Sequence, residues 1–485
     1  MVAVQMPLRS YDELDGPPGL PLLGNLLQLR YDKLHRILEG WAAQYGPLYR
    51  FRIGLRRLAA VSDPETIRRM HRERPDMFRR TRSVQATTAE MRINGVFSAE
   101  GDDWRRQRKI VAMALNTAHL KPFYPQLHTT TDRLLRRWQH AADRGQPVDL
   151  CRELMRFTVD VTTQLAFGID FNTLETDGPI IQQNLDKVFP VLNFRVNAPF
   201  PYWRYFRLPR DRELDRALTQ LQAQVDDIIA DVHRRMAADR TLYEAPTNFL
   251  EAMLAAKEAE GVGFSDADVF ANVCTLLLAG EDTTANTIAW AVDFFLQHPE
   301  HYARVRSEVD SAIAPAAIPA DIDQTARLPF LEAFYSEAMR LKPVAPQNAM
   351  EPLQDVEMCG HLIPRGTVVM LLNRRIATQD ENFDHAERFD PERWLVPAGE
   401  RQAAHDTSTF LPFGTGPRFC PGRNLALLQI RTVLAMLCRN FDIEIADPRQ
   451  QVEEKLAFTM MPTNLVVRLR RRPSSPAQTQ ARETP

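Results

Sequence analysis

Residues 413–422 read F-G-T-G-P-R-F-C-P-G and place one cysteine, Cys420, in a loop rich in glycine and proline. Residues 424–438 carry apolar side chains at a helical period, so Cys420 lies just before a predicted helix N-terminus. The N–H groups and the dipole of a helix end favour an anion, and therefore favour the thiolate form of this cysteine. Glycines lack a Cβ and let the backbone approach a sulfur atom or a flat cofactor closely. A lone cysteine is more often buried and inert, but that interpretation gives Arg418 and the glycines no role.

The complete pattern F-G-x-G-x-R-x-C-x-G resembles the haem-binding loop of the cytochrome P-450 family, the haem-thiolate monooxygenases. The resemblance implies that Cys420 is the axial thiolate ligand of the iron of haem b. Such a ligand pushes electron density onto the iron and favours O–O cleavage. The resemblance also implies that Arg418 pairs with a haem propionate, as a guanidinium suits a carboxylate. Phe413 would pack beside the sulfur, and Gly422 would complete the cofactor-binding loop.

Residues 265–298 predict one long helix, of roughly 50 Å at about 1.5 Å per residue, with Ser265 as its N-cap. Its middle reads A-G-E-D-T-T over residues 279–284. A glycine inside a helix costs about 1 kcal/mol relative to alanine, and adjacent threonines add little helix propensity. Broken local rules favour a functional site. A buried polar kink that serves packing alone would explain the same residues.

This run resembles the oxygen-activating motif of the same family, A/G-G-x-D/E-T. The resemblance implies that Ala279 and Gly280 leave room for oxygen above the iron. It further implies that Asp282 and Thr283 are an acid–alcohol pair that delivers protons.

Two other pairs of residues have the spacing of neighbours on a helix. Trp104 and Arg108 are four apart, and Glu337 and Arg340 are three apart. Alone, the first pair indicates a half-buried tryptophan beside a solvated arginine, and the second a surface ion pair of little energy. The family carries both motifs, so the resemblance implies that Trp104 and Arg108 hold a propionate. It also implies that Glu337, Arg340 and Arg393 form a buried structural triad.

One position departs from the family pattern. After P-V-A-P at residues 343–346, the family often has an arginine or a histidine that reaches a propionate, and the corresponding residue here is Met350. One propionate contact is therefore in question. The segments expected around the substrate are mostly apolar, which favours a lipophilic molecule such as a fatty acid, terpenoid or steroid. These segments are 81–97, 191–206, 344–348 and 460–463.

Composition excludes several classes of protein. Of the 485 residues, 44% are hydrophobic and 25% charged, as in ordinary soluble domains, and a net charge of -2 gives no reason to expect a nucleic-acid partner. The five cysteines are scattered without C-x-x-C or C-x-x-C-H spacing, which favours a reducing compartment and a non-covalent cofactor. The N-terminus lacks the roughly 20 apolar residues of a spanning helix and shows no secretory signal. We therefore expect no membrane anchor and a cytoplasmic protein, bacterial or otherwise cytosolic.

These features predict a mainly α-helical fold with small β-sheets, and the resemblance makes it the cytochrome P-450 fold. Haem would lie between the long helix and the cysteine loop. We expect a single domain over residues 14–472, with flexible tails at 1–13 and 473–485. Residues 452–470 predict a final β-hairpin around residues 461–464.

The resemblance implies a monooxygenase that inserts one oxygen atom of O₂ into a lipophilic small molecule, by hydroxylation or epoxidation. No G-x-G-x-x-G flavin signature is present, so electrons should come from a separate ferredoxin, flavodoxin or reductase. One alternative is a peroxide-driven hydroxylase or an isomerase on the same fold, although those lineages tend to lose the pair formed here by Asp282 and Thr283. The others are a non-catalytic haem sensor and a helical protein without haem.

Overall fold

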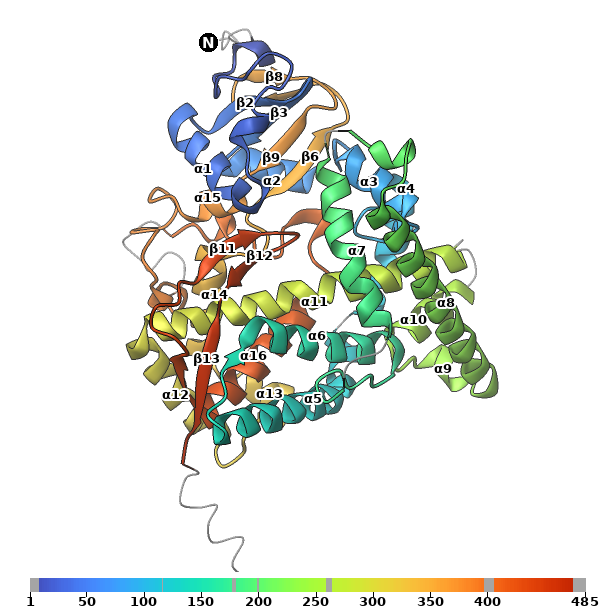
Figure 1. Cartoon of the computed structure of the whole chain (residues 1–485), viewed down its shortest axis with the longest axis vertical. Coiled ribbons are helices and arrows are strands. Elements are labelled where there is room, and N and C mark those ends of the chain that lie inside the picture. The colour runs from blue at the N-terminus through green and yellow to red at the C-terminus, as the bar shows by residue number, and fades with distance from the viewer. Residues whose placement is uncertain are drawn as a thin grey trace, which may run out of the picture.

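The computed structural model describes residues 8–115, 117–176, 180–198, 200–258, 264–396 and 405–473 (Figure 1). Most of the chain is helical, and the largest β-sheet lies at one end of the molecule with the N-terminal segment, drawn at the top of Figure 1. The long helix α11 (Asp266–Gln297) crosses the middle of the molecule. The mainly α-helical fold with small sheets is therefore confirmed.

Within the described residues, no helix is both long and apolar enough to cross a membrane. The α-helices are distributed along the whole chain. Besides α11, they are α1 (Leu34–Tyr45), α2 (Pro64–Arg72), α3 (Arg82–Glu90), α4 (Gly101–Ala114), α5 (Thr117–Asp143), α6 (Leu150–Phe167), α7 (Ile180–Asn197), α8 (Pro209–Ala238), α9 (Thr241–Glu244), α10 (Phe249–Glu258), α12 (Pro299–Ile313), α13 (Ile322–Thr325), α14 (Pro329–Leu341), α15 (Asn373–Ala377) and α16 (Arg423–Asn440).

The largest sheet has five strands in the order β2-β3-β9-β6-β4, in which only β3 and β9 pair in parallel. It joins strands from the first eighty residues to strands that follow α14, so segments far apart in the sequence lie side by side in one sheet. Its strands are β2 (Leu48–Ile53), β3 (Arg56–Val61), β4 (Phe78–Arg80), β6 (Asn348–Pro352) and β9 (Val368–Leu371).

Three smaller sheets complete the fold. Their orders are β1-β8-β7, β10-β13-β5 and β11-β12. Their strands are β1 (Arg9–Ser10), β5 (Val148–Asp149), β7 (Val356–Met358), β8 (His361–Ile363), β10 (Phe441–Ile445), β11 (Glu453–Leu456), β12 (Met460–Thr463) and β13 (Val466–Arg471).

Helix α11 begins where the sequence predicted. The Ser265 hydroxyl accepts a hydrogen bond from the Asp268 N–H at 3.2 Å, and the Asp268 carboxylate accepts one from the Ser265 N–H at 2.9 Å. This capping box satisfies two of the donors that a helix end leaves free. The helix packs against α6, α14 and α16 and is buried along most of its length, which explains its apolar composition.

The sequence predicted a final hairpin that turns at residues 461–464, and this turn is wrong. Strand β12 pairs with β11, so the tip of that hairpin is residues 457–459, and β13 pairs instead with β10. A turn does follow β12, where Asn464 has a φ of 61°, but the strands on its two sides do not pair with each other. Strand pairing is non-local, so a turn signal alone could not identify the partners.

The N-terminal tail is shorter than expected. Arg9 and Ser10 pair with β8, and a 3₁₀ turn follows at Tyr11–Glu13. The Tyr11 side chain is buried, and its hydroxyl donates a hydrogen bond to the Leu58 carbonyl at 2.8 Å. The remaining residues of the two predicted tails, 1–7 and 474–485, lie outside the described residues.

One carboxylate of α11 makes the stability of the fold depend on pH. Asp293 is only 5% exposed, and burial raises its pKa to about 6, against the opposing effects of Lys342 and of a hydrogen bond from Gln297. The folded protein therefore binds this proton more tightly than the unfolded chain, and stability is lost as the pH rises from about 4 to about 6.

Asn at this position cannot ionise, so Asp293→Asn should stabilise the protein at pH 7 by up to about 3 kcal/mol. The gain should shrink to well under about 1 kcal/mol near pH 4, where the folded carboxyl is protonated and the unfolded one is only about half ionised. Urea unfolding of both proteins at the two pH values tests this. The same difference in unfolding free energy at pH 4 and pH 7 would contradict it.

Candidate functional site

The main cavity lies between α11 and the cysteine loop, residues 413–422. Helix α4, strand β6 and the tip of the β11–β12 hairpin complete its walls. Asp282 and the triad Glu337, Arg340 and Arg393 are not among the residues that line it. The predicted site residues that do line it are Trp104, Arg108, Ala279, Gly280, Thr283, Phe413, Arg418, Cys420 and Gly422.

Backbone contacts fix the shape of the cysteine loop. The Cys420 N–H donates to the Phe413 carbonyl and the Phe419 N–H to the Gly416 carbonyl, both at 3.0 Å. Gly416 has a φ of 70°, and a Cβ at this position would lie 2.5 Å from the His71 carbonyl oxygen. Only glycine fits this conformation at this distance, and its presence lets the loop pack directly on the end of α2.

The environment of Cys420 contains opposing influences on its ionisation. Burial raises the pKa of the thiol, while the N–H groups of Gly422 and Arg423 and the positive charge of Arg108 lower it. Burial is the largest of these effects, so the fold alone does not favour the thiolate that we expected from the helix end. A metal ion bound to the sulfur would deprotonate such a thiol outright.

A group of guanidinium side chains lines the cavity beside the cysteine loop. Arg74 and Arg418 both contact the carboxylate of Glu100, at 3.4 Å and 2.7 Å. The Arg418 guanidinium also lies over the Trp104 ring, 4.6 Å from its centre. Arg80 lines the same wall, and its backbone N–H donates to Glu100 at 2.9 Å. We call Arg74, Arg80 and Arg418 the arginine cluster.

The sequence predicted Arg418 but not the residues gathered around it. His71, Arg74, Arg80 and Glu100 come from the end of α2, from β4 and from the residue before α4, and none belongs to a recognisable motif. Burial, together with the charges of Arg74 and Arg80, lowers the pKa of His71 to about 4. Its imidazole is therefore neutral at pH 7. The only sequence signal for these four residues is the abundance of arginine in residues 68–82, which is too common a feature to identify a site.

The opposite wall of the cavity is the middle of α11. Ala279, Gly280, Thr283, Thr284 and Thr287 line it. The Thr283 hydroxyl donates to the Ala279 carbonyl at 2.7 Å, and the Thr287 hydroxyl donates to the Thr283 carbonyl at 2.8 Å. Both threonine hydroxyls therefore bond to the carbonyl one turn back in the helix. Each hydroxyl oxygen keeps a lone pair that can accept a hydrogen bond from a molecule in the cavity.

Two residues of the same helix segment, Gly280 and Asp282, lie towards α6. A Cβ at Gly280 would lie 2.7 Å from the Thr162 hydroxyl oxygen, so the glycine allows close packing of the two helices. The Asp282 charge contributes to the raised pKa of Cys151, a residue of α6, after the larger effects of burial and Asp149. Asp282 therefore lies on the α6 flank while Thr283 lines the cavity, as expected for consecutive residues about 100° apart around a helix.

The predicted triad is assembled around one fully buried carboxylate. Glu337 accepts hydrogen bonds from Arg340 at 2.7 and 2.8 Å, from Arg393 at 2.9 Å and from the Trp394 indole at 2.9 Å. The Trp394 ring packs on Phe410, with ring centres 4.6 Å apart. Phe410 lies three residues before the cysteine loop, so these contacts connect the triad to the loop.

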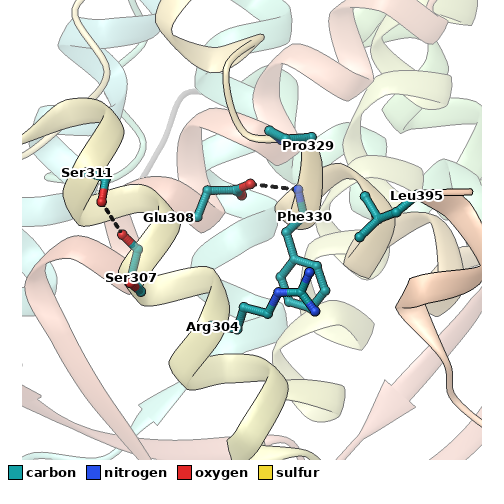
Figure 2. Close-up of a pocket in the computed structure, with 7 residues that line it drawn as sticks. All are labelled: Arg304, Ser307, Glu308, Ser311, Pro329, Phe330 and Leu395. Carbon is teal, nitrogen blue, oxygen red and sulfur yellow. Dashed lines mark hydrogen bonds between the residues drawn. The ribbon is translucent and has the colours of Figure 1, made fainter.

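A separate, open groove lies at the surface between α12 and α14 (Figure 2). The Glu308 carboxylate accepts hydrogen bonds from the N–H groups of Phe330 and Leu331 at 2.8 and 2.9 Å, and so caps the start of α14. The Arg304 guanidinium lies 3.8 Å from the centre of the Phe330 ring. The charged groups of this groove are engaged in holding the helices, which assigns them a structural role.

Comparison with known proteins identifies the family. A family model described as Cytochrome P450 matches residues 14–469, nearly the whole chain. The chain belongs to the cytochrome P450 family. The fold of cytochrome P450 is also that of a similar solved structure, the crystal structure of the cytochrome P450DA haem domain, with a TM-score of 0.83 and 24% identity. That comparison covers 97% of this chain and 98% of the other.

Two curated relatives illustrate the range of cytochrome P450 enzymes that this chain resembles. The mitochondrial 25-hydroxyvitamin D-1 alpha hydroxylase of Rattus norvegicus is 28% identical over 459 residues, which cover 90% of this chain and 89% of the relative. Carnosic acid synthase of Rosmarinus officinalis is 29% identical over 455 residues, with 89% and 86% covered. Their names support a cytochrome P450 monooxygenase.

Cytochrome P450 enzymes hold haem through a cysteine thiolate. Of the five cysteines in this chain, Cys420 lines the main cavity. Cys274 and Cys438 are fully buried, and Cys151 is partly buried in α6. Cys359 is exposed in the turn between β7 and β8. The position of Cys420 therefore suits the ligand, and the positions of the other four do not.

The charges around the cavity also fit haem. The arginine cluster brings three guanidinium groups to one carboxylate, Glu100, which leaves an excess of two positive charges. The Nε atoms of all three arginines, and Nη1 of Arg418, are buried without a hydrogen-bond partner among the described residues. Buried cations without partners are costly, so this wall is built to receive an anion. The two propionates of haem would supply the missing charge and the missing acceptors.

Proposed function

We propose that this cytochrome P450 inserts one oxygen atom of O₂ into a neutral, lipophilic small molecule. The observation that carries the proposal is one cavity that joins the Cys420 thiol on the loop to the Thr283 hydroxyl on α11. Haem bound there would bind and activate O₂. The residues of the chain supply its ligand, its anchors, a route for protons and a pocket for the substrate.

On the loop side, Cys420 would be the ligand of the iron, with the N–H groups of Gly422 and Arg423 stabilising its negative charge. Arg108 would balance the same charge, because it lowers the pKa of Cys420. Arg418 and Trp104 would hold a propionate, since they already contact each other in the cavity wall. Phe413 would pack beside the sulfur, where the backbone of the loop holds it.

On the α11 side, Ala279 would leave space for O₂ because its side chain is only a methyl group, and Gly280, whose missing Cβ makes room for α6, would border the same space. The Thr283 hydroxyl would hold a proton at the cavity wall, and its bond to the Ala279 carbonyl fixes its direction. Asp282 would collect protons from the α6 flank of the helix and pass them towards Thr283. Proton delivery by a positioned group is typically worth about 10²–10⁴-fold in rate.

The triad of Glu337, Arg340 and Arg393 would act through structure alone. Its members lie outside the cavity, and both arginines bond to the Glu337 carboxylate in a fully buried network. Through Trp394 and Phe410 the network would fix the approach to the cysteine loop.

The composition of the cavity supports a neutral and lipophilic substrate. No aspartate or glutamate is among the described residues that line it, and its arginines and its histidine come from α2, β4, α4 and the cysteine loop. The remaining polar residues of the wall are uncharged. Away from the cysteine loop, the apolar lining residues include Ile93, Val96, Phe97, Val111, Leu115, Leu192, Phe249, Leu276, Leu278, Val344 and Phe458.

Electrons would reach the site from a flavin or iron–sulfur centre outside these 485 residues, because the chain carries no flavin signature. A ferredoxin, a flavodoxin or a reductase would serve. Fused relatives also occur: the bifunctional cytochrome P450/NADPH–P450 reductase of Fusarium oxysporum is 26% identical over 460 residues, and the matched part is 42% of its length.

Isotope labelling of the product tests the function. The haem-loaded protein, a surrogate ferredoxin with its reductase, and NADPH would be given a panel of neutral terpenoids and steroids. Each would be paired with an analogue bearing an amine. We expect neutral compounds to shift the Soret band and to yield products with one ¹⁸O atom from ¹⁸O₂ and none from labelled water.

Three results would contradict the proposal. Product formation with hydrogen peroxide but not with O₂ and NADPH would favour the peroxide-driven hydroxylase. Binding without any substrate-dependent NADPH consumption across the panel would favour a sensor. Stronger binding of the amines than of their neutral partners would refute the substrate class.

A further inference from the structure

The hairpin of β11 and β12 carries a buried carboxylate near its open end and an aromatic ring at its tip, and it lies between α15 and α11 (Figure 1). The carboxylate belongs to Glu454 of β11, whose side chain is 3% exposed. The ring belongs to Phe458, which lines the main cavity and lies 6.1 Å from the Phe97 ring. The activity proposed for the cavity gives Glu454 no role.

Four side chains from outside the hairpin contact the Glu454 carboxylate. His35 Nε2 lies at 2.9 Å, Arg36 Nε at 2.6 Å and Arg374 Nη1 at 3.1 Å. The Lys342 ammonium is the fourth contact. Two of these residues belong to α1, one belongs to α15 and one directly follows α14. One carboxylate therefore joins the hairpin to three separate parts of the fold.

Glu454 keeps its charge in this buried position. Burial alone would raise the pKa of Glu454, but its hydrogen bonds and the positive charges around it hold that pKa well below its usual range. Removing one partner of a buried ion pair is strongly destabilising, whereas an exposed pair contributes little. The neighbouring Glu453 forms an exposed pair, because its side chain is 56% exposed and lies 3.1 Å from Lys33. Glu454 should therefore hold β11 in place far more firmly than Glu453 does.

The β12 side of the hairpin is held by neutral contacts with α11. The Trp290 indole donates a hydrogen bond to the Met460 carbonyl at 3.1 Å, and the Asn286 amide donates one to the Thr459 hydroxyl at 3.0 Å. Arg374 links the two sides, since the Nη1 atom that contacts the carboxylate on β11 also lies 3.5 Å from the Met460 sulfur. The charged contacts are thus the main restraint on the β11 side.

A shift of β11 at Glu454 would be transmitted to the tip. Phe458 is four residues further along the chain, which is at most about 13 Å in an extended strand. All four residues of β11 pair with β12, so the hairpin moves as one unit up to its tip. The position of the carboxylate therefore influences the position of the Phe458 ring.

We propose that Glu454 is a positioning residue that sets how far the Phe458 ring projects into the main cavity, and thereby the length of the molecule that fits between this ring and the haem. The inference rests on the proposed function only in that haem occupies the cavity. A carboxylate that served stability alone would change the unfolding of the protein without changing which ligands the cavity prefers.

A series of 1-alkylimidazoles measures the length of the available space in the holoenzyme. The imidazole binds the haem iron and shifts the Soret band, while the alkyl chain extends into the cavity. Each methylene that finds apolar space should tighten binding by about fourfold, and this gain should stop where the chain meets the Phe458 ring. Dissociation constants for butyl to dodecyl chains would be measured with the wild type, Glu454→Gln, Phe458→Ala and the double variant Glu454→Gln/Phe458→Ala.

Both single variants should continue to gain affinity at chain lengths where the wild type no longer does. In Phe458→Ala the ring is absent, and in Glu454→Gln it is no longer held in place. The double variant should match Phe458→Ala within about twofold at every chain length, because the effects of residues that act through one contact do not add.

Two further variants keep the test decisive. Glu453→Gln removes the neighbouring carboxylate on the opposite face of β11 and should keep the wild-type dependence on chain length. If Glu454→Gln does not fold, Arg36→Gln removes a single partner whose side chain is 55% exposed. It should change the dependence in the same direction by a smaller amount. Thermal unfolding and the reduced, carbon monoxide-bound spectrum are recorded for every variant.

The wild-type dependence on chain length in Glu454→Gln would overturn the inference, as it would in Arg36→Gln where Glu454→Gln does not fold. Additive effects in the double variant would also overturn it. A lower unfolding temperature with an unchanged dependence would show that Glu454 serves stability alone. If the wild type binds no alkylimidazole with a Soret shift, or lacks the spectrum of a thiolate ligand, the proposed function fails instead.

Discussion

The Cys420→His variant is expected to lose the red-shifted Soret band that the reduced, carbon monoxide-bound wild type should show. The band reports a thiolate bound to iron, and Cys420 is the cysteine that lines the main cavity. An imidazole can still hold the iron, so the variant should keep haem with the spectrum of a histidine ligand. Turnover should fall by more than the roughly 10–100-fold typical of losing a residue that hydrogen-bonds to a metal ligand.

The other cysteines provide the control. Cys359 is exposed between two short strands and Cys151 lies in α6, so Cys359→Ser and Cys151→Ser should both keep the red-shifted band. Difference spectra of the dithionite-reduced proteins with carbon monoxide make the comparison. A red-shifted band in Cys420→His, or its loss in Cys359→Ser, would refute the ligand assignment.

The parts of the site that the sequence predicted are those with local signals. The start of α11 follows from Ser265 and Asp268, which cap each other. The helix after the cysteine follows from its apolar period, and the tight loop follows from Gly416, which no other residue could replace. In each case the physical constraint acts within a few residues of the chain, so a single sequence contains it.

The parts that it missed depend on contacts between distant segments. Arg80 lies beside Met350 in the cavity wall because β4 pairs with β6, more than 250 residues later. Glu100 matters because Arg74 and Arg418 converge on it from two sides. The same limit explains the misplaced turn of the final hairpin, since a turn signal does not specify which strands pair.

The ionisation of Cys420 shows a conflict between a local and a global effect. The helix end acts as the sequence predicted and lowers the pKa of the thiol, and Arg108, whose effect was not predicted, acts in the same direction. Burial acts in the opposite direction and is larger, and burial is a property of the whole fold. If Cys420 is the haem ligand, as proposed, the iron would deprotonate the sulfur where the helix end alone does not.

The Thr283→Ala variant should divert reducing equivalents into hydrogen peroxide. Its hydroxyl lines the cavity and is fixed by the Ala279 carbonyl, so its removal should leave haem content, spectrum and substrate binding unchanged. No hydroxyl would then position the protons that enter the cavity. The amount of product formed per NADPH should therefore fall by about 10²-fold or more. Asp282→Asn should slow NADPH consumption more than it lowers coupling, because Asp282 lies on the flank that supplies protons.

Thr284 gives the control for this prediction. It is 2% exposed and also borders the cavity, but it lies about 100° further round the helix. Coupling should therefore depend on Thr283 and not on Thr284, and Thr283→Ser should restore it because serine keeps the hydroxyl. NADPH, peroxide and product would be measured in the same reactions. If Thr284→Ala uncouples the reaction and Thr283→Ala does not, the proton-delivering residue is Thr284. Unchanged peroxide yield in both variants would remove the acid–alcohol pair from the mechanism and favour peroxide-driven chemistry.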